Sequence, residues 1–110
     1  MGHNYQPNEV MMEKHRRTLF SRSDEGGSVS VTATLQENGS IELFDHDIGE
    51  NARRMFGRDD REYVTTVPAD ETGKLALALI AESYADDSRA TVKLRELCEK
   101  NGIRFSVFTN

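Results

Sequence analysis

Cysteine is nearly absent from this sequence. Cys98 is the single one, so the chain can form no internal disulfide. Long apolar runs are also missing: no stretch approaches the ~20 residues that a helix needs to span a bilayer, and residues 1–7 lack the apolar segment of a signal peptide. These absences predict a cytoplasmic protein, in a reducing compartment, with no membrane partner.

Positive charge is in short supply as well. The sequence has 14 Lys and Arg residues against 19 Asp and Glu residues, a net charge of −5. Nucleic acid is therefore an unfavoured partner, because neutralising phosphates requires a basic face. Residues 1–22 carry four basic and two acidic side chains, so the acidity belongs to the rest of the chain. This distribution favours a basic protein partner or self-association of opposite patches, although solubility is the simpler explanation.

The motifs of common enzymes are missing too. The sequence has no Gly-x-Ser-x-Gly nucleophile elbow, no glycine-rich loop between a strand and a helix, and no paired His or Cys motif. Cys98 falls on the apolar side of an expected helix, where a thiol usually serves as a small core side chain. We therefore predict no catalytic residue and no cofactor, and an enzyme is the less favoured class.

What the sequence does contain is strong strand alternation. Residues 28–36 alternate apolar and polar side chains, as in a strand with one buried face. The dipeptide Asn-Gly that follows signals a hairpin. A three-residue loop at residues 37–39, with its glycine left-handed, pairs Leu35 with Ile41. A two-residue turn would put Ile41 on the wrong face, so the longer loop is expected.

The middle of the chain predicts a strand, a helix and a second strand. Asp47 is a preferred N-cap residue, and Glu50 can complete a capping box. Phe44 falls with Glu42 and His46 on the second face of the expected sheet, so this face should be at least partly covered. The expected elements are a strand at Ile41–Asp45, a helix at Asp47–Phe56, a charged turn at Gly57–Arg61 and a strand at Glu62–Val67.

Elements on either side complete an α+β fold. The expected order is β-β-β-α-β-α-α-β, with about five mostly antiparallel strands and helices on one face of the sheet. We expect residues 10–110 to form a single α+β domain after a loose lead-in at residues 1–9. The flanking elements are a strand at Lys14–Ser23, a main helix opened by Ala69-Asp70-Glu71, a helix at Thr91–Lys100 and a last strand at Ile103–Phe108.

One segment resembles other proteins. The run from Glu62 to Glu71, which reads EYVTTVPADE and precedes a Leu/Ala-rich helix, resembles a strand–VPA–helix segment of small uncharacterised bacterial proteins. The resemblance covers about a quarter of the chain. It implies a bacterial α+β domain of unknown activity, and it carries over no functional residue.

His46 is the residue best suited to a metal site, because carboxylates surround it in the sequence. Asp45, Asp47 and Glu50 are its neighbours, with Glu42 four positions before it, and imidazole with carboxylate suits zinc or manganese. Successive residues of a strand point to opposite faces, however, and Asp47 already has a capping role. We therefore predict no metal ligand.

An arginine cluster is the other candidate. Arg53, Arg54, Arg58 and Arg61 offer planar groups that suit phosphate. Acidic residues lie between and beside them, notably at positions 59–60. A solvated charged surface is therefore the favoured interpretation.

These patterns favour a non-enzymatic protein-binding domain of the adaptor, inhibitor or immunity type. The alternative is a small enzyme or metal-binding protein that uses His46 and nearby carboxylates. An exposed strand edge and an apolar second face also favour a homodimer. The residues expected to contact a partner are Glu42, Phe44, His46, Arg54, Arg58 and Tyr63.

Overall fold

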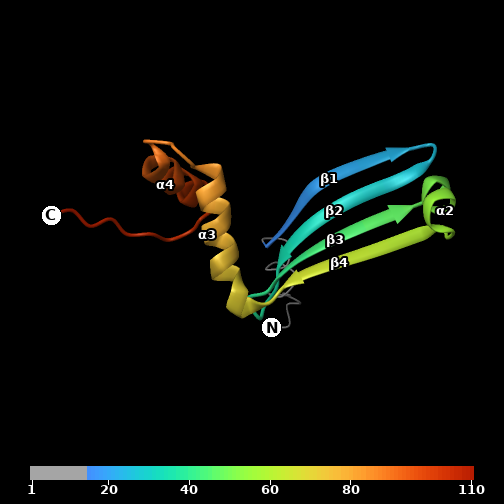
Figure 1. Cartoon of the computed structure of the whole chain (residues 1–110), viewed down its shortest axis with the longest axis horizontal. Helices are drawn as coiled ribbons and strands as arrows, with labels where there is room; N and C mark the ends of the chain where they lie inside the picture. Colours follow the sequence, from blue (N-terminus) through green and yellow to red (C-terminus); the bar gives the residue numbers. More distant parts are fainter. Residues whose placement is uncertain (1–14) are drawn as a thin grey trace, which may run out of the picture. The chain divides into compact units, whose positions relative to one another are not determined.

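The computed structural model describes residues 15–110 and divides the chain into two compact units (Figure 1). The first unit ends at Gly73, and the second comprises Lys74–Asn110. No helix within residues 15–110 is long and apolar enough to cross a membrane. The lead-in expected at residues 1–9 lies outside the described residues, and the single domain expected at residues 10–110 stays a prediction.

The first unit is built on four strands that follow one another across one sheet (Figure 1). The strand order is β1-β2-β3-β4, so β1 and β4 are the edge strands, and each consecutive pair is antiparallel. An antiparallel sheet together with helices confirms the expected α+β class. A short helix, α2, connects the last two strands at one end of the sheet. The elements are β1 (Arg16–Asp24), β2 (Gly27–Leu35), β3 (Ile41–Ile48), α2 (Glu50–Phe56) and β4 (Asp60–Val67).

The β2–β3 hairpin has the register that the apolar alternation predicts. Leu35 lies opposite Ile41, and Ala33 lies opposite Leu43. Gly39 adopts φ 90°, in the region that glycine enters at little cost. The prediction of a three-residue loop is therefore confirmed, and it fixes which side chains of β3 share a face.

The β1–β2 turn lies against the end of β3 and the start of α2. The backbone N–H of Asn51 donates to the carbonyl of Gly26 (2.9 Å), and the carboxylate of Asp24 accepts the N–H of Gly26 (2.8 Å). Gly27 has φ 127°, and a Cβ there would collide with the carbonyl oxygen of Ile48. This close approach ties the turn to the segment that leads into α2.

Helix α2 begins later than the sequence suggests, and the expected N-cap at Asp47 is wrong. Strand β3 continues to Ile48, because its pairing with β4 extends through Asp47, which lies opposite Arg61. The helix begins at Glu50, with Gly49 at the N-cap position and no side-chain cap. The expected capping box is therefore absent, since backbone pairing holds Asp47 in the strand.

Strand alternation gives the sheet two faces of different character. Helix α2 lies over one end of the first face. Among the described residues only Ala52 of α2 and Ser40 are buried. The first face carries Val29, Val31, Ala33, Leu35, Ile41, Leu43, Asp45, Asp47, Arg61, Tyr63, Thr65 and Val67. The second face carries Ser30, Thr32, Thr34, Glu42, Phe44, His46, Ile48, Asp60, Glu62, Val64 and Thr66.

After β4, a single 3₁₀ turn at Ala69–Glu71 leads into α3 (Thr72–Ser83), and α4 (Ala90–Lys100) follows. The last strand, expected at Ile103–Phe108, is not confirmed, because residues 103–110 form no strand. Part of this tail lies beside α4, where Phe105 and Val107 line a shallow hollow together with Leu94 and Cys98. The sheet of the described chain therefore has four strands, and neither the expected five strands nor the expected final strand is confirmed.

The turn between α3 and α4 is stabilised by Asp87. Its carboxylate accepts hydrogen bonds from the Lys93 ammonium (2.6 Å) and from the backbone N–H of Arg89 (2.8 Å). These bonds hold the pKa of Asp87 below its usual value, and the bond from Lys93 has the larger effect. Asp87 therefore stays ionised down to lower pH than an ordinary carboxyl group.

Replacing Gly27 by alanine should destabilise the first unit. The added Cβ collides with the Ile48 carbonyl, and a positive φ strains any residue with a side chain. We expect the free energy of unfolding, measured in urea by circular dichroism, to fall by about 2–3 kcal/mol. Gly73→Ala is the matched control: a Cβ there meets no atom within 4 Å, so stability should hold or rise by up to about 1 kcal/mol. Identical unfolding curves for Gly27→Ala and the wild type would contradict the close approach.

Candidate functional site

Three of the six residues expected to contact a partner lie together on the second face. Glu42, Phe44 and His46 occupy alternate positions of β3. The rings of Phe44 and His46 are 5.5 Å apart between centroids and tilted by 38°. Phe44 lies directly opposite Val64 of β4, which is 54% exposed. The register thus places an apolar pair, a half-buried Phe44 and an exposed Val64, midway along β3 and β4.

The surroundings of that pair are polar. On β2, Thr32 lies opposite Phe44 and Ser30 lies opposite His46. At one end, the carboxylate of Glu42 accepts a hydrogen bond from the side-chain amide of Gln36 (3.1 Å). The apolar pair on the second face therefore has hydroxyl and carboxylate groups beside it, and exposed Ile48 lies toward the end of the face near α2.

The other three expected contact residues lie elsewhere. Tyr63 is opposite Asp45, so its side chain belongs to the first face. Arg54 of α2 donates to the side-chain oxygen of Asn51 (2.6 Å), and Arg58 donates to the carbonyl of Asp60 (3.1 Å). The six residues thus do not form one surface.

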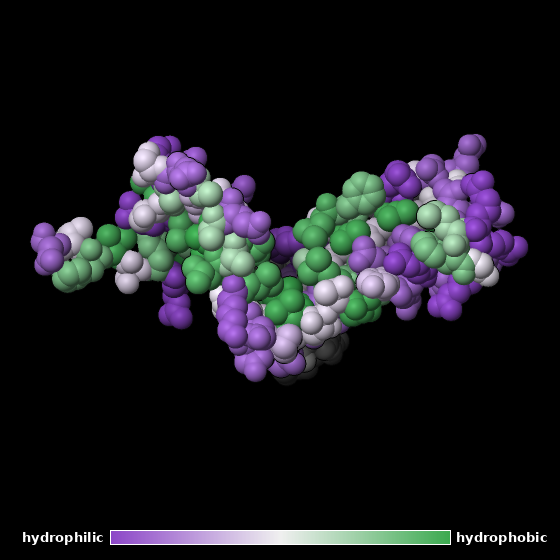
Figure 2. Space-filling view, in the orientation of Figure 1, coloured by the Kyte–Doolittle hydropathy of each residue, from purple (hydrophilic) through white to green (hydrophobic). Residues whose placement is uncertain are grey.

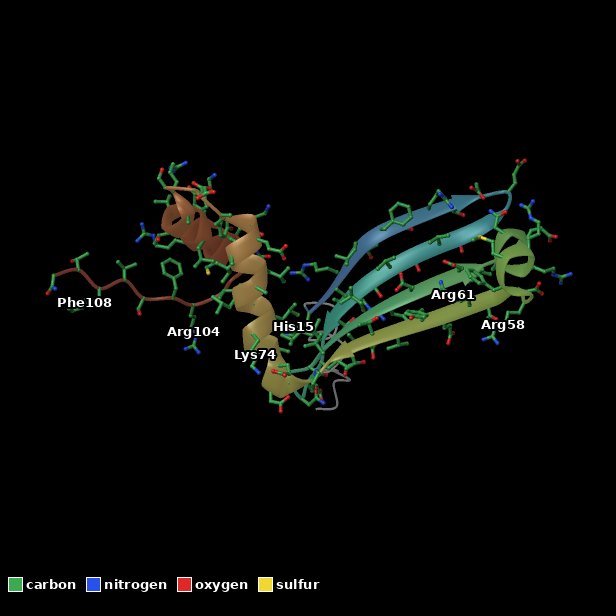
Figure 3. All side chains as sticks on the ribbon, viewed as in Figure 1. His15, Arg58, Arg61, Lys74, Arg104 and Phe108 are labelled. Carbon is green, nitrogen blue, oxygen red and sulfur yellow. The ribbon has the colours of Figure 1, made fainter. Side chains whose placement is uncertain are left out.

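Arg61 connects α2 to the sheet, a role that the sequence did not indicate. Its guanidinium lies 4.6 Å from the centroid of the Phe56 ring and 4.8 Å from that of Tyr63, and it donates to the carboxylate of Asp47 (3.4 Å). Cation–π contact with two rings and an ion pair hold these four side chains together. Figure 3 shows Arg58 and Arg61 at the α2 end of the sheet, where Figure 2 shows hydrophilic residues gathered.

The arginines do not converge on a shared anion site. Arg53 pairs with Asp59 through a bond of 2.7 Å between Nε and Oδ1. This hydrogen bond, with the Coulomb attraction between the two groups, raises the pKa of Arg53 and lowers that of Asp59. Arg54, Arg58 and Arg61 each have a different partner. The interpretation as a solvated charged surface therefore agrees with the geometry.

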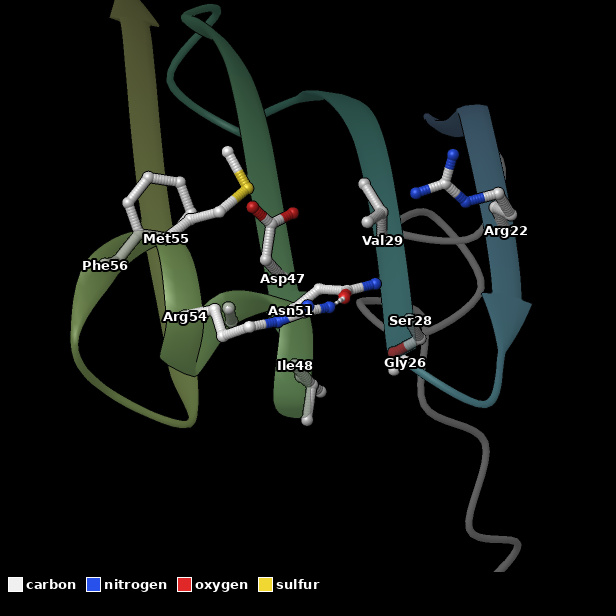
Figure 4. Close-up of a pocket in the computed structure, with 12 residues that line it drawn as sticks. Arg22, Gly26, Ser28, Val29, Asp47, Ile48, Asn51, Arg54, Met55 and Phe56 are labelled. Atoms are coloured by element: carbon white, nitrogen blue, oxygen red, sulfur yellow. Dashed lines mark hydrogen bonds between the residues drawn. The ribbon is translucent and has the colours of Figure 1, made fainter.

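A hollow of about 360 Å³ lies between α2 and the nearby strand ends (Figure 4). Its charged lining groups are already paired: Asp47 with Arg61, Arg54 with Asn51, and Arg22 with Asp24 at 3.9 Å. The hollow thus offers volume but no group poised for chemistry. Its lining residues are Arg22, Gly26, Gly27, Ser28, Val29, Asp47, Ile48, Asn51, Ala52, Arg54, Met55 and Phe56.

His46 does meet carboxylates, but not the ones next to it in the sequence. Asp45 and Asp47 lie on the first face, as strand alternation requires. Pairing with β4 instead places Glu62 opposite His46, with Nε2 and Oε1 3.9 Å apart, and Asp60 two positions further along the same face. Ligand atoms of the three residues all lie within 4.8 Å of one another. We refer to His46, Asp60 and Glu62 as the cross-strand cluster.

No protein-family model matches the chain, and no curated protein or solved structure matches it either. The relationship to small bacterial proteins suggested by residues 62–71 therefore stays a prediction.

Removing the Arg61 guanidinium should loosen α2 from the sheet. We expect Arg61→Ala to lower the free energy of unfolding by about 1–2 kcal/mol, since it removes two cation–π contacts and a partly buried ion pair. Arg58→Ala is the control: within residues 15–110 its guanidinium donates a hydrogen bond to a backbone carbonyl and pairs with no carboxylate, so the change should cost less than about 0.5 kcal/mol. Urea unfolding of the three chains gives both values. Equal losses in the two variants would contradict the role of Arg61.

Proposed function

We propose that this chain is a non-enzymatic protein-binding domain, of the adaptor, inhibitor or immunity type, that binds its partner on the second face of the sheet. The Phe44–Val64 pair carries the proposal. Accessible apolar side chains at the centre of a polar surface are the usual arrangement of a binding hot spot with its rim. The partner would bury this pair and meet the hydroxyl groups around it.

Charge on the second face favours a basic partner. Glu42, Asp60 and Glu62 lie on this face, whereas Arg16, opposite Thr34, is the basic residue that the strand register puts there. An acidic rim attracts a basic surface and speeds association, and this attraction weakens as salt rises. The proposal includes a cytoplasmic location, which the single cysteine favours, and it includes no membrane or nucleic-acid partner.

Edge strand β4 adds a second mode of contact. It runs for eight residues and has no partner strand on its outer side among the described residues. By contrast, the other edge strand, β1, has an irregularity between Thr18 and Phe20, a feature that discourages strand addition. A partner seated on the second face, or another copy of the chain, could therefore also pair with β4.

One observation also favours the alternative function suggested by the sequence. A small enzyme or metal-binding protein that uses His46 would draw on Asp60 and Glu62 of β4 rather than on Asp45, Asp47 or Glu50. The cross-strand cluster is the observation that favours this alternative.

Truncating Phe44 should weaken partner binding selectively. A protein retained from a lysate of the source organism by the immobilised chain would be purified, and its affinity measured by calorimetry. We expect Phe44→Ala and Val64→Thr to weaken binding at least about tenfold, as for hot-spot residues. Thr65→Ala, on the first face of β4, is the control and should leave the affinity within about twofold, as a residue outside the interface does.

The salt dependence of the same interaction tests the acidic rim. We expect the affinity to fall steeply as salt rises, and Glu42→Gln to reduce that slope, because a rim charge is lost. An affinity that is flat in salt would contradict the basic partner. Equal binding by Phe44→Ala and wild-type chains, both folded by circular dichroism, would overturn the second face as the binding surface.

A further inference from the structure

We propose that the cross-strand cluster of His46, Asp60 and Glu62 is a binding site for a divalent transition-metal ion, with Zn²⁺ as the ion of choice. This inference does not rest on the proposed protein-binding function. It rests on the register of β3 against β4, which brings together one imidazole and two carboxylates that are 14 to 16 positions apart in the sequence.

The three ligands differ in how firmly they are placed. The imidazole of His46 lies beside the Phe44 ring, and its side chain is only 26% exposed. The carboxylate of Glu62 is 59% exposed, and Asp60 is exposed as well. A site of this kind has one fixed nitrogen ligand, while the two oxygen ligands can adjust their torsion angles to the ion.

The distances require only a small contraction. Bonds of about 2.0–2.2 Å in a tetrahedral zinc site place neighbouring ligand atoms about 3.3 Å apart. His46 Nε2 and Glu62 Oε1 are 3.9 Å apart, and no pair in the cluster exceeds 4.8 Å. The ligand atoms must therefore come closer by at most about 1.5 Å, a distance within the range of side-chain rotation by Glu62 and Asp60.

Electrostatics favour a cation at this position. Two carboxylates lie close together, and among the described residues neither pairs with an arginine or a lysine; Glu62 only approaches His46 at 3.9 Å. Arg58 is near in sequence, but it donates to the backbone carbonyl of Asp60. A divalent ion would neutralise both carboxylates.

The ligand set selects the class of ion. Imidazole nitrogen with carboxylate oxygen suits zinc and related transition metals, whereas Mg²⁺ and Ca²⁺ prefer all-oxygen sites. Three protein ligands leave one position of a tetrahedral ion open. A water molecule, or a side chain of a bound partner, would complete the coordination.

Calorimetric titration of Zn²⁺ into the full chain tests the site. We expect His46→Gln, Asp60→Asn and Glu62→Gln each to weaken Zn²⁺ binding at least about tenfold, since even the loss of an outer-sphere partner costs that much in a metal site. Asp45→Asn is the matched control. It removes a carboxylate adjacent to His46 in the sequence but on the opposite face, so Zn²⁺ affinity should stay within about twofold. His15→Gln controls for binding by another imidazole in the same way.

A spectroscopic readout separates the site from general loss of structure. In ¹H–¹⁵N spectra of the histidine rings, Zn²⁺ should shift the His46 signals before those of His15, and Mg²⁺ should not. Each variant is first compared with the wild type by circular dichroism. Unchanged Zn²⁺ affinity in folded His46→Gln, or His46 signals that do not move at about 1 mM Zn²⁺, a concentration that saturates all but the weakest sites, would overturn the proposal.

Discussion

Backbone pairing of β3 with both of its neighbours is the constraint on which the rest of the first unit depends. Because side chains alternate along a strand, a shift of one residue would exchange the two faces. His46 and Phe44 would then turn together away from Glu62, and Asp47 would turn away from Arg61. The hairpin loop at residues 37–39 sets the register on one side of β3. On the other side of β3, the pairing with β4 continues as far as Asp47 opposite Arg61 and Ile48 opposite Asp60.

The register of β2 against β3 could be predicted, whereas that of β3 against β4 could not. In the hairpin, the apolar alternation on both strands and the short loop with Gly39 leave one consistent pairing. Between β3 and β4 the chain passes through α2 and a charged turn, and the length of such a connection does not fix a register. The sequence therefore indicates only the neighbours of His46 as its partners, whereas Glu62 and Asp60 on β4 are the carboxylates that approach it.

Strand pairing also explains why two other predictions from local sequence, the N-cap at Asp47 and the last strand at residues 103–108, do not match the structure. Asp47 is a residue type that often caps helices, but its backbone pairs with Arg61 in the sheet, so the helix begins later, at Glu50. Ile103, Phe105 and Val107 alternate with more polar residues as in a strand, but alternation shows only which side chains share a side. A strand also needs a neighbour for its backbone groups, and residues 103–110 have none among the described residues.

The two proposed sites share residues, because Asp60 and Glu62 belong both to the acidic surface that would attract a basic partner and to the cross-strand cluster. A divalent ion bound there would neutralise two of the three carboxylates on this face and leave Glu42. The attraction for a basic partner would then weaken, unless that partner supplied the open coordination position of the ion. By thermodynamic reciprocity, a partner that binds better with the ion present raises the affinity of the chain for the ion, and a partner that binds worse lowers it by the same factor. The sign of that coupling distinguishes a metal that completes the interface from one that competes with it.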